Sequence, residues 1–253
     1  MRGDRATRYQ GPFASWEEAE KECDGYDSPA ILEATRSAVT RYLQGEGVFE
    51  RDSFLVEEPE YPYFLLASVL NVLTRHNGTA HIVDFGGALG SSYYQLCSFL
   101  GRTPDCVWHV VEQEAHVTCG KAEFESDNLK FHFRVEDCLA ELDEPPALLV
   151  LSGVLHVLPD PYLTLSALLQ HDFPMVLIDR APLAKDRDDA VYVYRVPPQI
   201  YVASFPFWLL NRDRLLGTME PQYQLAARFQ DANPLRMGGE DHGRWGFLFF
   251  RGD

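Results

Sequence analysis

One acid and three glycines stand close together in the segment Asp84-Phe85-Gly86-Gly87-Ala88-Leu89-Gly90-Ser91. The short run His81 to Phe85 predicts a strand, and the stretch Ser91 to Leu100 predicts a helix. Glycines at such a strand-to-helix turn allow tight bending and let the backbone come close to a ligand. We therefore expect this loop to bind a cofactor through Asp84, Gly86, Gly87, Gly90 and Ser91.

Two kinds of cofactor bind at a turn of this type, namely dinucleotides and S-adenosylmethionine. The dinucleotide pattern G-x-G-x-x-G requires glycine where Phe85 stands, although Gly87 and Gly90 fit it. We expect Asp84 to place a carboxylate at the mouth of the loop, where it would repel a pyrophosphate and attract the ammonium group of S-adenosylmethionine. The loop thus favours the sulfonium cofactor; the alternative is a turn that only connects a strand to a helix.

Acids also follow the next two expected strands. Glu112 ends the strand Val107 to Glu112, and an ionised carboxylate, which only accepts hydrogen bonds, suits the two hydroxyls of a ribose. Asp137 follows the third strand and is a candidate for the adenine amino group, with Glu136 as a close competitor. A solvated helix start is the alternative explanation for Asp137.

The order of predicted elements changes near residue 78. Before it the pattern is helical: Ser15 and Glu18 form a capping box, Ser28-Pro29 precedes the helix Ala30 to Gln44, and Tyr63 to Thr74 has the length of a helix. After it, short strands alternate with helices, which is typical of βα units. The expected strands are His81–Phe85, Val107–Glu112, Leu129–Phe133, Leu148–Leu151, Met175–Asp179, Tyr223–Gln230 and Trp245–Arg251, the last two forming a hairpin.

These elements predict an α/β protein with a three-layer Rossmann-like fold. It would contain a seven-stranded, mostly parallel sheet with an antiparallel terminal hairpin, and an N-terminal helical cap. We expect residues 1–77 to form the cap on the acceptor side, residues 78–253 to form the cofactor-binding core, and residues 183–218 to form a lid insertion. A ligand crevice is expected at the carboxyl ends of the first and fourth strands.

These residues resemble the class I S-adenosylmethionine-dependent methyltransferases, which share such a sheet, an acidic glycine-rich first loop and an acid ending the second strand. The sequence resembles more closely one bacterial family of predicted methyltransferases, often found among genes for surface-polysaccharide or small-molecule assembly. The similarity spans nearly the whole chain and includes Glu50-Arg51-Asp52-Ser53, Leu89-Gly90-Ser91-Ser92-Tyr93, Val111-Glu112-Gln113, Leu151-Ser152-Gly153 and Ile178-Asp179-Arg180. The resemblance implies S-adenosylmethionine as cofactor, S-adenosylhomocysteine as product, and Gln113, Ser152 and Gly153 beside the cofactor.

Methyl transfer from a sulfonium is an in-line displacement in which alignment supplies much of the acceleration. A base is needed only when the acceptor must lose a proton early. His156, after the fourth strand, is the first candidate, and Asp179, at the end of the fifth, is the second. The alternatives are a structural histidine bonded to backbone and an Asp179 that pairs with Arg180.

Two further segments are candidates for binding the acceptor. In the long connection after the fifth strand we expect Arg195 and Tyr201 to face the ligand; the alternative is a hydrophobic plug over the sheet edge. The acidic run around Glu57, Glu58 and Glu60 is a candidate clamp for an amine or guanidinium, with Glu58 also a candidate catalytic residue. A solvated charge cluster at a helix start is the alternative there.

Composition restricts the partners. The formal net charge of −16 disfavours nucleic acid and anionic membranes. Five scattered cysteines without a C-x-x-C pair predict neither disulfides nor a zinc knuckle, and the eight histidines show no ligand spacing, so no metal is expected. The start lacks an apolar signal core and the apolar run Ala147 to Leu158 is too short to span a bilayer, so we expect a soluble cytoplasmic protein.

The sequence thus predicts methyl transfer to a small polar molecule, at a sugar hydroxyl or at an amino or guanidino nitrogen, in a biosynthetic pathway. The expected partner is this small-molecule acceptor, with a homodimer as an option. One alternative is a methyltransferase-like protein that binds cofactor or a partner without catalysis. A nicotinamide oxidoreductase is the less favoured alternative, because of Phe85 and Asp84.

Overall fold

The computed structural model describes residues 8–51, 53–56, 62–75, 80–100, 106–230, 235–237 and 239–252. The chain divides into two compact units. Unit 1 comprises Met1–Ile31, Gly153–Asp172 and Ile178–Asp253, and unit 2 comprises Leu32–Ser152 and Phe173–Leu177. Among the described residues, the helices are all too short or too polar to cross a membrane.

Unit 2 contains a parallel sheet with strand order β7-β4-β5-β6. Its strands are β4 (Ala80–Phe85), β5 (Cys106–Val111), β6 (Leu129–His132) and β7 (Leu148–Ser152). The sequences of these strands are nearly continuous runs of apolar residues, because helices cover a parallel sheet on both faces. The carboxyl ends of the four strands meet at one edge, called here the carboxyl edge of unit 2.

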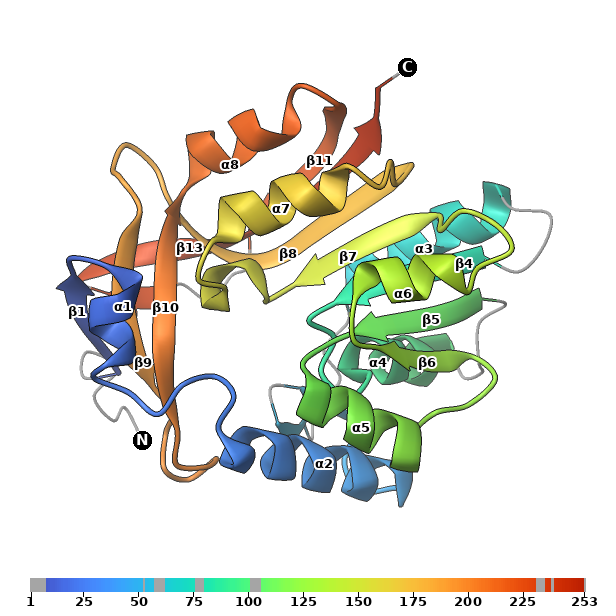
Figure 1. Ribbon diagram of the computed structural model, residues 1–253, viewed down its shortest axis with the longest axis horizontal. Helices are drawn as coiled ribbons and strands as arrows, with labels where there is room; N and C mark the ends of the chain where they lie inside the picture. The colour runs from blue at the N-terminus through green and yellow to red at the C-terminus, as the bar shows by residue number, and fades with distance from the viewer. Residues whose placement is uncertain are drawn as a thin grey trace. The chain divides into compact units, whose positions relative to one another are not determined.

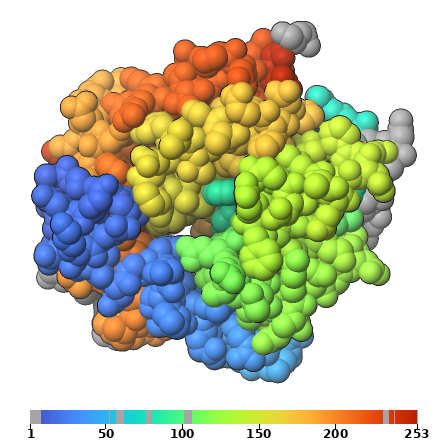
Figure 2. All heavy atoms as spheres, in the orientation of Figure 1, coloured from blue at the N-terminus to red at the C-terminus, as the bar shows by residue number. Residues whose placement is uncertain are grey.

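The helices of unit 2 cover this sheet (Figure 1). They are α3 (Tyr63–Arg75), α4 (Ser91–Leu100), α5 (Glu114–Glu123), α6 (Val135–Ala140) and most of α2 (Pro29–Leu43). α6 packs on β5 and β6, α5 on β6, and α3 on β7. A small hairpin of β2 (Phe49–Arg51) and β3 (Phe54–Val56) packs on α4. In Figure 2, atoms in the green part of the colour range, which includes α5 and α6, cover much of the visible face of unit 2.

Unit 1 is built on mixed strands in the order β1-β9-β10-β8. β8 (Met175–Ala184), which begins in unit 2, pairs in parallel with β10 (Ser204–Asn211), whereas β9 (Ala190–Arg195) is antiparallel to β10 and to β1 (Tyr9–Phe13). β13 (Glu240–Arg251) pairs with β8, β11 (Tyr223–Gln230) and β12 (Leu235–Met237). The helical segments are α1 (Trp16–Glu20), η2 (Leu155–Val157), α7 (Pro161–Leu169) and α8 (Arg212–Met219).

The predicted fold class is confirmed, because the sheet combines a parallel core with antiparallel strands. The seven expected strands are present, and among the described residues the sheet has eleven strands, with β1, β9, β10 and β12 in addition. β1, β2 and β3 fall within the segment expected to be a helical cap. All of β9 and β10, and α8 except Met219, fall within the expected lid. β1 was not predicted because it contains Gly11 and Pro12, which do not indicate a strand. A strand at the edge of a sheet tolerates both residues.

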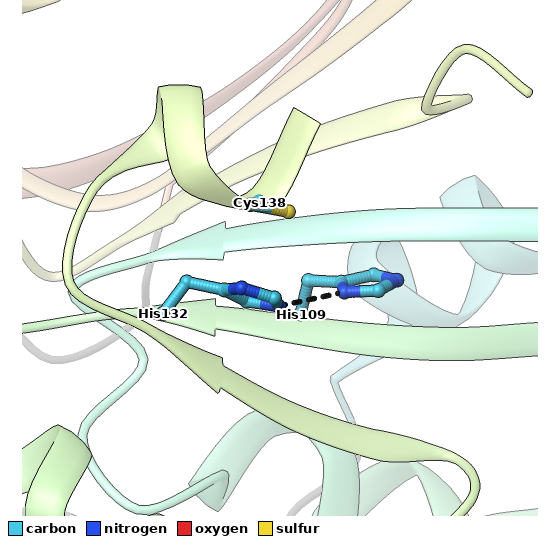
Figure 3. Close-up of side chains that lie close together, drawn as sticks. All are labelled: His109, His132 and Cys138. Carbon is cyan, nitrogen blue, oxygen red and sulfur yellow. Dashed lines mark hydrogen bonds between the residues drawn. The ribbon is translucent and has the colours of Figure 1, made fainter. Parts of the chain in front are cut away.

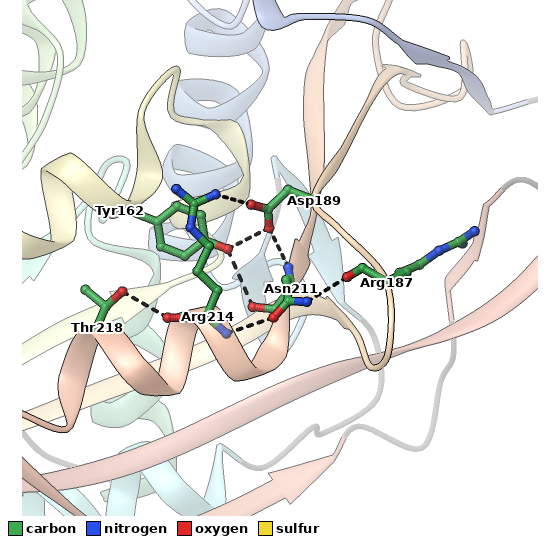
Figure 4. Close-up of polar contacts among 6 residues, drawn as sticks. All are labelled: Tyr162, Arg187, Asp189, Asn211, Arg214 and Thr218. Carbon is green, nitrogen blue, oxygen red and sulfur yellow. Dashed lines mark hydrogen bonds and ion pairs between the residues drawn. The ribbon is translucent and has the colours of Figure 1, made fainter.

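A polar cluster in unit 1 joins α7, β10 and α8 (Figure 4). Asp189 accepts hydrogen bonds from the Tyr162 hydroxyl (2.6 Å), the Asn211 backbone N–H (2.5 Å) and the Arg214 guanidinium (2.5 Å). Asn211 in turn caps α8, its side-chain oxygen accepting from Arg214 N (2.7 Å). Burial, and then the bond to Asp189, raise the pKa of Tyr162 above its ordinary value.

Replacing Asp189 with alanine is expected to lower the free energy of unfolding by about 2 to 4 kcal/mol. The change removes the carboxylate that accepts from a half-buried hydroxyl and from a backbone N–H, and each such loss costs about 1 to 3 kcal/mol. Urea unfolding measures the effect, with Asp188→Ala, an exposed neighbour, as the matched control. Equal midpoints for the two variants would show that the cluster does not stabilise the protein.

Candidate cofactor site

The loop between β4 and α4 is folded tightly against β5. Gly86 N donates to Val111 O (2.9 Å), and Gly90 N donates to Gly87 O (2.9 Å). Gly86 (φ +75°) and Gly90 (φ +94°) have left-handed backbone conformations that favour glycine. Ala88 (φ +52°) shares this region, which is unfavourable for a residue with a Cβ. The backbone contacts therefore determine the conformation of the loop.

Asp84 lies beneath this loop and not at its mouth, so the expected position of its carboxylate was wrong. Its side chain is 1% exposed, and Oδ2 accepts a hydrogen bond from Trp108 Nε1 (3.0 Å). A Cβ added to Gly87 would lie 2.7 Å from the Asp84 carboxyl carbon and from Oδ2. The Gly87 backbone therefore rests directly on the buried carboxyl group, which makes Asp84 a support for the loop.

Glu112 faces the same loop from the end of β5. Its Oε1 accepts a hydrogen bond from Ala88 N (3.2 Å), and its Oε2 accepts from Gln113 N (2.7 Å). Glu112 is half-buried and Gln113 is exposed. Because a carboxylate can accept about four hydrogen bonds, two acceptor positions of Glu112 remain for ligand hydroxyls beside the loop.

The other predicted cofactor residues of unit 2 also lie at its carboxyl edge. Ser91 begins α4, Ser152 ends β7, and Asp137 is exposed in the first turn of α6. Its competitor Glu136 accepts a hydrogen bond from Arg134 Nε (3.2 Å). The structure thus brings the loop, Glu112, Asp137 and Ser152 to one edge of one sheet.

Glu50 is a positioning residue of this site that the sequence analysis did not select. Its side chain is 1% exposed, and its carboxylate accepts hydrogen bonds from the Ser91 hydroxyl and from Ser53 N (2.9 Å). It therefore links the β2–β3 turn to the start of α4. The available signal was the string Glu50-Arg51-Asp52-Ser53, which lies between the predicted helices Ala30–Gln44 and Tyr63–Thr74 and by itself does not indicate burial.

Gly153, His156 and Asp179 belong to unit 1. Gly153 (φ +72°) donates from its N–H to Asp179 O (2.9 Å), and the Arg180 guanidinium lies against its Cα. Asp179 Oδ1 accepts from Arg180 N (2.7 Å). The His156 ring packs against Phe207 with ring centroids 4.5 Å apart.

The residues expected to bind the acceptor have other contacts or lie outside the described residues. The exposed Arg195 donates from its guanidinium to Gln10 Oε1 (3.0 Å) and to Glu22 O (3.4 Å). Tyr201 is half-buried and packs against an apolar cluster of unit 1 that includes Phe205. Glu57, Glu58 and Glu60 lie outside the described residues.

Comparison with known proteins shows similarity at the level of the fold. No family model matches the sequence, and no curated protein is similar to it. A solved structure of a pericyclic reaction enzyme is similar over 77% of this chain and 49% of its own, with 14% identity and a TM-score of 0.51. This chain therefore spans about half the length of that enzyme.

Solved S-adenosylmethionine-dependent methyltransferases are also among the similar structures, all at low identity. The N-methyltransferase NodS from Bradyrhizobium japonicum, in complex with S-adenosylhomocysteine, is 14% identical, with 88% of this chain and 97% of NodS covered and a TM-score of 0.47. The N-terminal domain of EvdMO1, in the presence of S-adenosylhomocysteine and D-fucose, is 16% identical, with 91% and 100% covered and a TM-score of 0.49. The specific bacterial family stays a prediction.

Proposed function

We propose that the protein binds S-adenosylmethionine at the carboxyl edge of unit 2 and transfers its methyl group to a small polar acceptor. One observation carries this proposal: the Glu112 carboxylate and the backbone of the Gly86–Gly90 loop are hydrogen-bonded to each other through Ala88 N. An acceptor for a ribose diol thus lies beside the partly exposed backbone of Gly86 and Ala88. This pairing suits an adenosine bearing an amino-acid chain.

The residues present fit such a cofactor. The loop backbone would lie along its amino-acid portion, and Glu112 would accept hydrogen bonds from the ribose hydroxyls. Gln113 and Asp137 would border the adenine, with Asp137 preferred because Arg134 already engages Glu136. Bound S-adenosylmethionine supplies an electrophilic methyl group on a sulfonium. The task of the chain is to hold the acceptor in line with that group.

A diphosphate fits the same loop less well. Phe85 stands where a dinucleotide loop needs glycine, and Ala88 N already donates to Glu112. Glu112 itself suits either cofactor, because both carry ribose hydroxyls. A pyrophosphate needs free N–H donors at a helix start, and Ala88 N is not free. These features favour the sulfonium cofactor over NAD.

The acceptor we propose carries an amino or guanidino nitrogen or a sugar hydroxyl and belongs to a biosynthetic pathway in the cytoplasm. His156 and Asp179 are the proposed bases where the acceptor must lose a proton. Glu57, Glu58, Arg195 and Tyr201 stay predicted acceptor contacts. The net charge of −16 favours a cationic acceptor over a phosphorylated one.

Methyl-labelled S-adenosylmethionine tests the proposed transfer. The protein would be incubated with labelled cofactor and separate pools of amines, guanidines and sugars, and the products identified by mass spectrometry. We expect one pool to gain label in equal amount to the S-adenosylhomocysteine released. Cofactor binding without S-adenosylhomocysteine release in any pool would instead indicate a cofactor-binding protein without catalysis.

A further inference from the structure

Three histidines form a row across the sheet of unit 2. His81 on β4 and His109 on β5 share a hydrogen bond (Nδ1 to Nε2, 3.0 Å), and His109 and His132 on β6 share another (Nδ1 to Nε2, 3.0 Å). His109 is 4% exposed and His132 is 3% exposed. The parallel register places alternate residues of neighbouring strands on one face, so the three rings line up without any spacing motif in the sequence.

Cys138 of α6 completes this cluster from above the sheet. Figure 3 shows its sulfur over the two imidazole rings of His109 and His132. Ligand atoms of the three side chains all lie within 4.8 Å of one another. The Cys138 side chain is fully buried, as are most atoms of both rings.

Both rings also have a partner on their other nitrogen. His132 Nδ1 lies 3.7 Å from Glu141 Oε2, just beyond the end of α6, while His109 Nε2 faces His81. Metal-binding histidines almost always contact such a group through the nitrogen that does not bind the metal, which fixes the ring orientation. The cluster therefore has both the donor atoms and the supporting contacts of a metal site.

We propose that His109, His132 and Cys138 bind one zinc ion between α6 and the strands β5 and β6. Two imidazoles and a thiolate are typical ligands of zinc, whereas magnesium and calcium require oxygen ligands. The two nitrogens that face each other are 3.0 Å apart, close to the separation of about 3.3 Å for two nitrogens on a tetrahedral zinc. Only a small movement of the rings and the sulfur would be needed.

Zinc binding would displace protons from the cluster. The thiol proton of Cys138 leaves to solvent as the Zn–S bond forms. The proton between His109 Nδ1 and His132 Nε2 moves to the other nitrogen of the ring that carries it, so that each ring stays neutral. His81 then accepts from His109 Nε2, and Glu141 accepts from His132 Nδ1. Burial raises the pKa of the Cys138 thiol to about 12, so the free cysteine is neutral. Metal affinity is therefore expected to fall as the pH is lowered.

The ion would fix α6 on the sheet. Cys138 is adjacent to Asp137, the residue proposed to border the adenine, so the metal would also hold that end of the carboxyl edge of unit 2. The proposal itself rests on the histidine and cysteine geometry and not on methyl transfer. No metal was expected because the histidines and cysteines show no ligand spacing; ligands that come from two strands and a helix leave no such spacing in the sequence.

A chain of neutral imidazoles without metal is the competing explanation. Burial, and then the neighbouring His132 and His81, lower the pKa of His109 to about 3, so its ring is neutral. Such rings can link by hydrogen bonds alone. The two explanations differ in whether the untagged protein takes up a thiolate-bound metal.

Metal content and cobalt substitution test this directly. Untagged protein would be analysed for zinc as purified, then treated with chelator and titrated with Co²⁺, whose thiolate charge-transfer absorption reports a Co–S bond. We expect one zinc per chain, the cobalt–thiolate band saturating at one equivalent, and its loss when Zn²⁺ is added. Folded wild-type protein that shows neither bound zinc nor this band would overturn the proposal.

The Cys138→Ala variant tests whether the sulfur of Cys138 gives rise to the cobalt–thiolate band. Cys106→Ala is the matched control, since both cysteines are fully buried. Cys138→Ala is expected to lose the band and to bind Co²⁺ at least tenfold more weakly, whereas Cys106→Ala retains both. Loss of the band in Cys106→Ala alone would contradict the assignment. If Cys138→Ala does not fold, the rate at which Cys138 of the wild-type protein is alkylated tests the proposal instead. Zn²⁺ is expected to lower this rate, and an unchanged rate would overturn the proposal.

Discussion

Replacing Gly87 with alanine is expected to weaken cofactor binding at least tenfold and to lower the free energy of unfolding by about 1 to 3 kcal/mol. The added Cβ would lie 2.7 Å from two atoms of the Asp84 carboxyl group. That group cannot move aside easily, because it is buried and bonded to Trp108 Nε1. The loop would therefore be lifted from its support, and the backbone surface proposed to meet the cofactor would be displaced.

The matched control for this change is Gly217→Ala. A Cβ at Gly217, in the interior of α8, meets no atom within 4 Å. Alanine in a helix interior is favoured over glycine by about 0.5 to 1 kcal/mol, so Gly217→Ala should raise stability slightly and leave binding unchanged. Urea unfolding and calorimetric titration with S-adenosylhomocysteine measure both variants. Full cofactor affinity in Gly87→Ala would show that the loop is not the binding surface.

Glu112→Gln is expected to weaken S-adenosylmethionine binding about tenfold to a hundredfold with little change in stability. The amide oxygen can still accept from Ala88 N, so the loop keeps its contact with β5. The charge is lost, however, and one of two acceptor oxygens becomes a donor. Hydrogen bonds to a charged group contribute about 1.5 to 3 kcal/mol, which corresponds to this range of affinity.

Glu114→Gln serves as its control, because Glu114 is an exposed acid in the first turn of α5, two residues away. This variant removes the same charge without touching the loop. Calorimetric titration of both variants separates a direct contact from a general effect of charge. Equal affinities in the two variants would exclude Glu112 as the ribose contact.

The parallel core was predictable because its signals are local. The strands β4 to β8 are short apolar runs between helix-length segments, and glycines mark the turn after β4. β9 carries the same kind of signal, with five apolar residues in Ala190–Arg195, but its place within the long connection after the fifth expected strand favoured a lid. Its pairing with β1 and β10 depends on contacts between distant segments, which local patterns do not contain.

The candidate site was predictable as a set of residues but not in its geometry. The sequence places Asp84 and Glu112 at strand ends, yet alternation along β4 turns Asp84 toward Trp108 and under the loop. The burial of Glu50 requires the β2–β3 hairpin to pack on α4. The histidine row likewise arises only when the strands are in register.

Calorimetric titration of the wild-type protein with S-adenosylmethionine, and separately with NADH, tests the central claim most directly. The proposal predicts one S-adenosylmethionine site per chain, competition by S-adenosylhomocysteine, and no heat of binding with NADH. Binding of NADH, or no binding of S-adenosylmethionine by protein shown to be folded by circular dichroism, would contradict it.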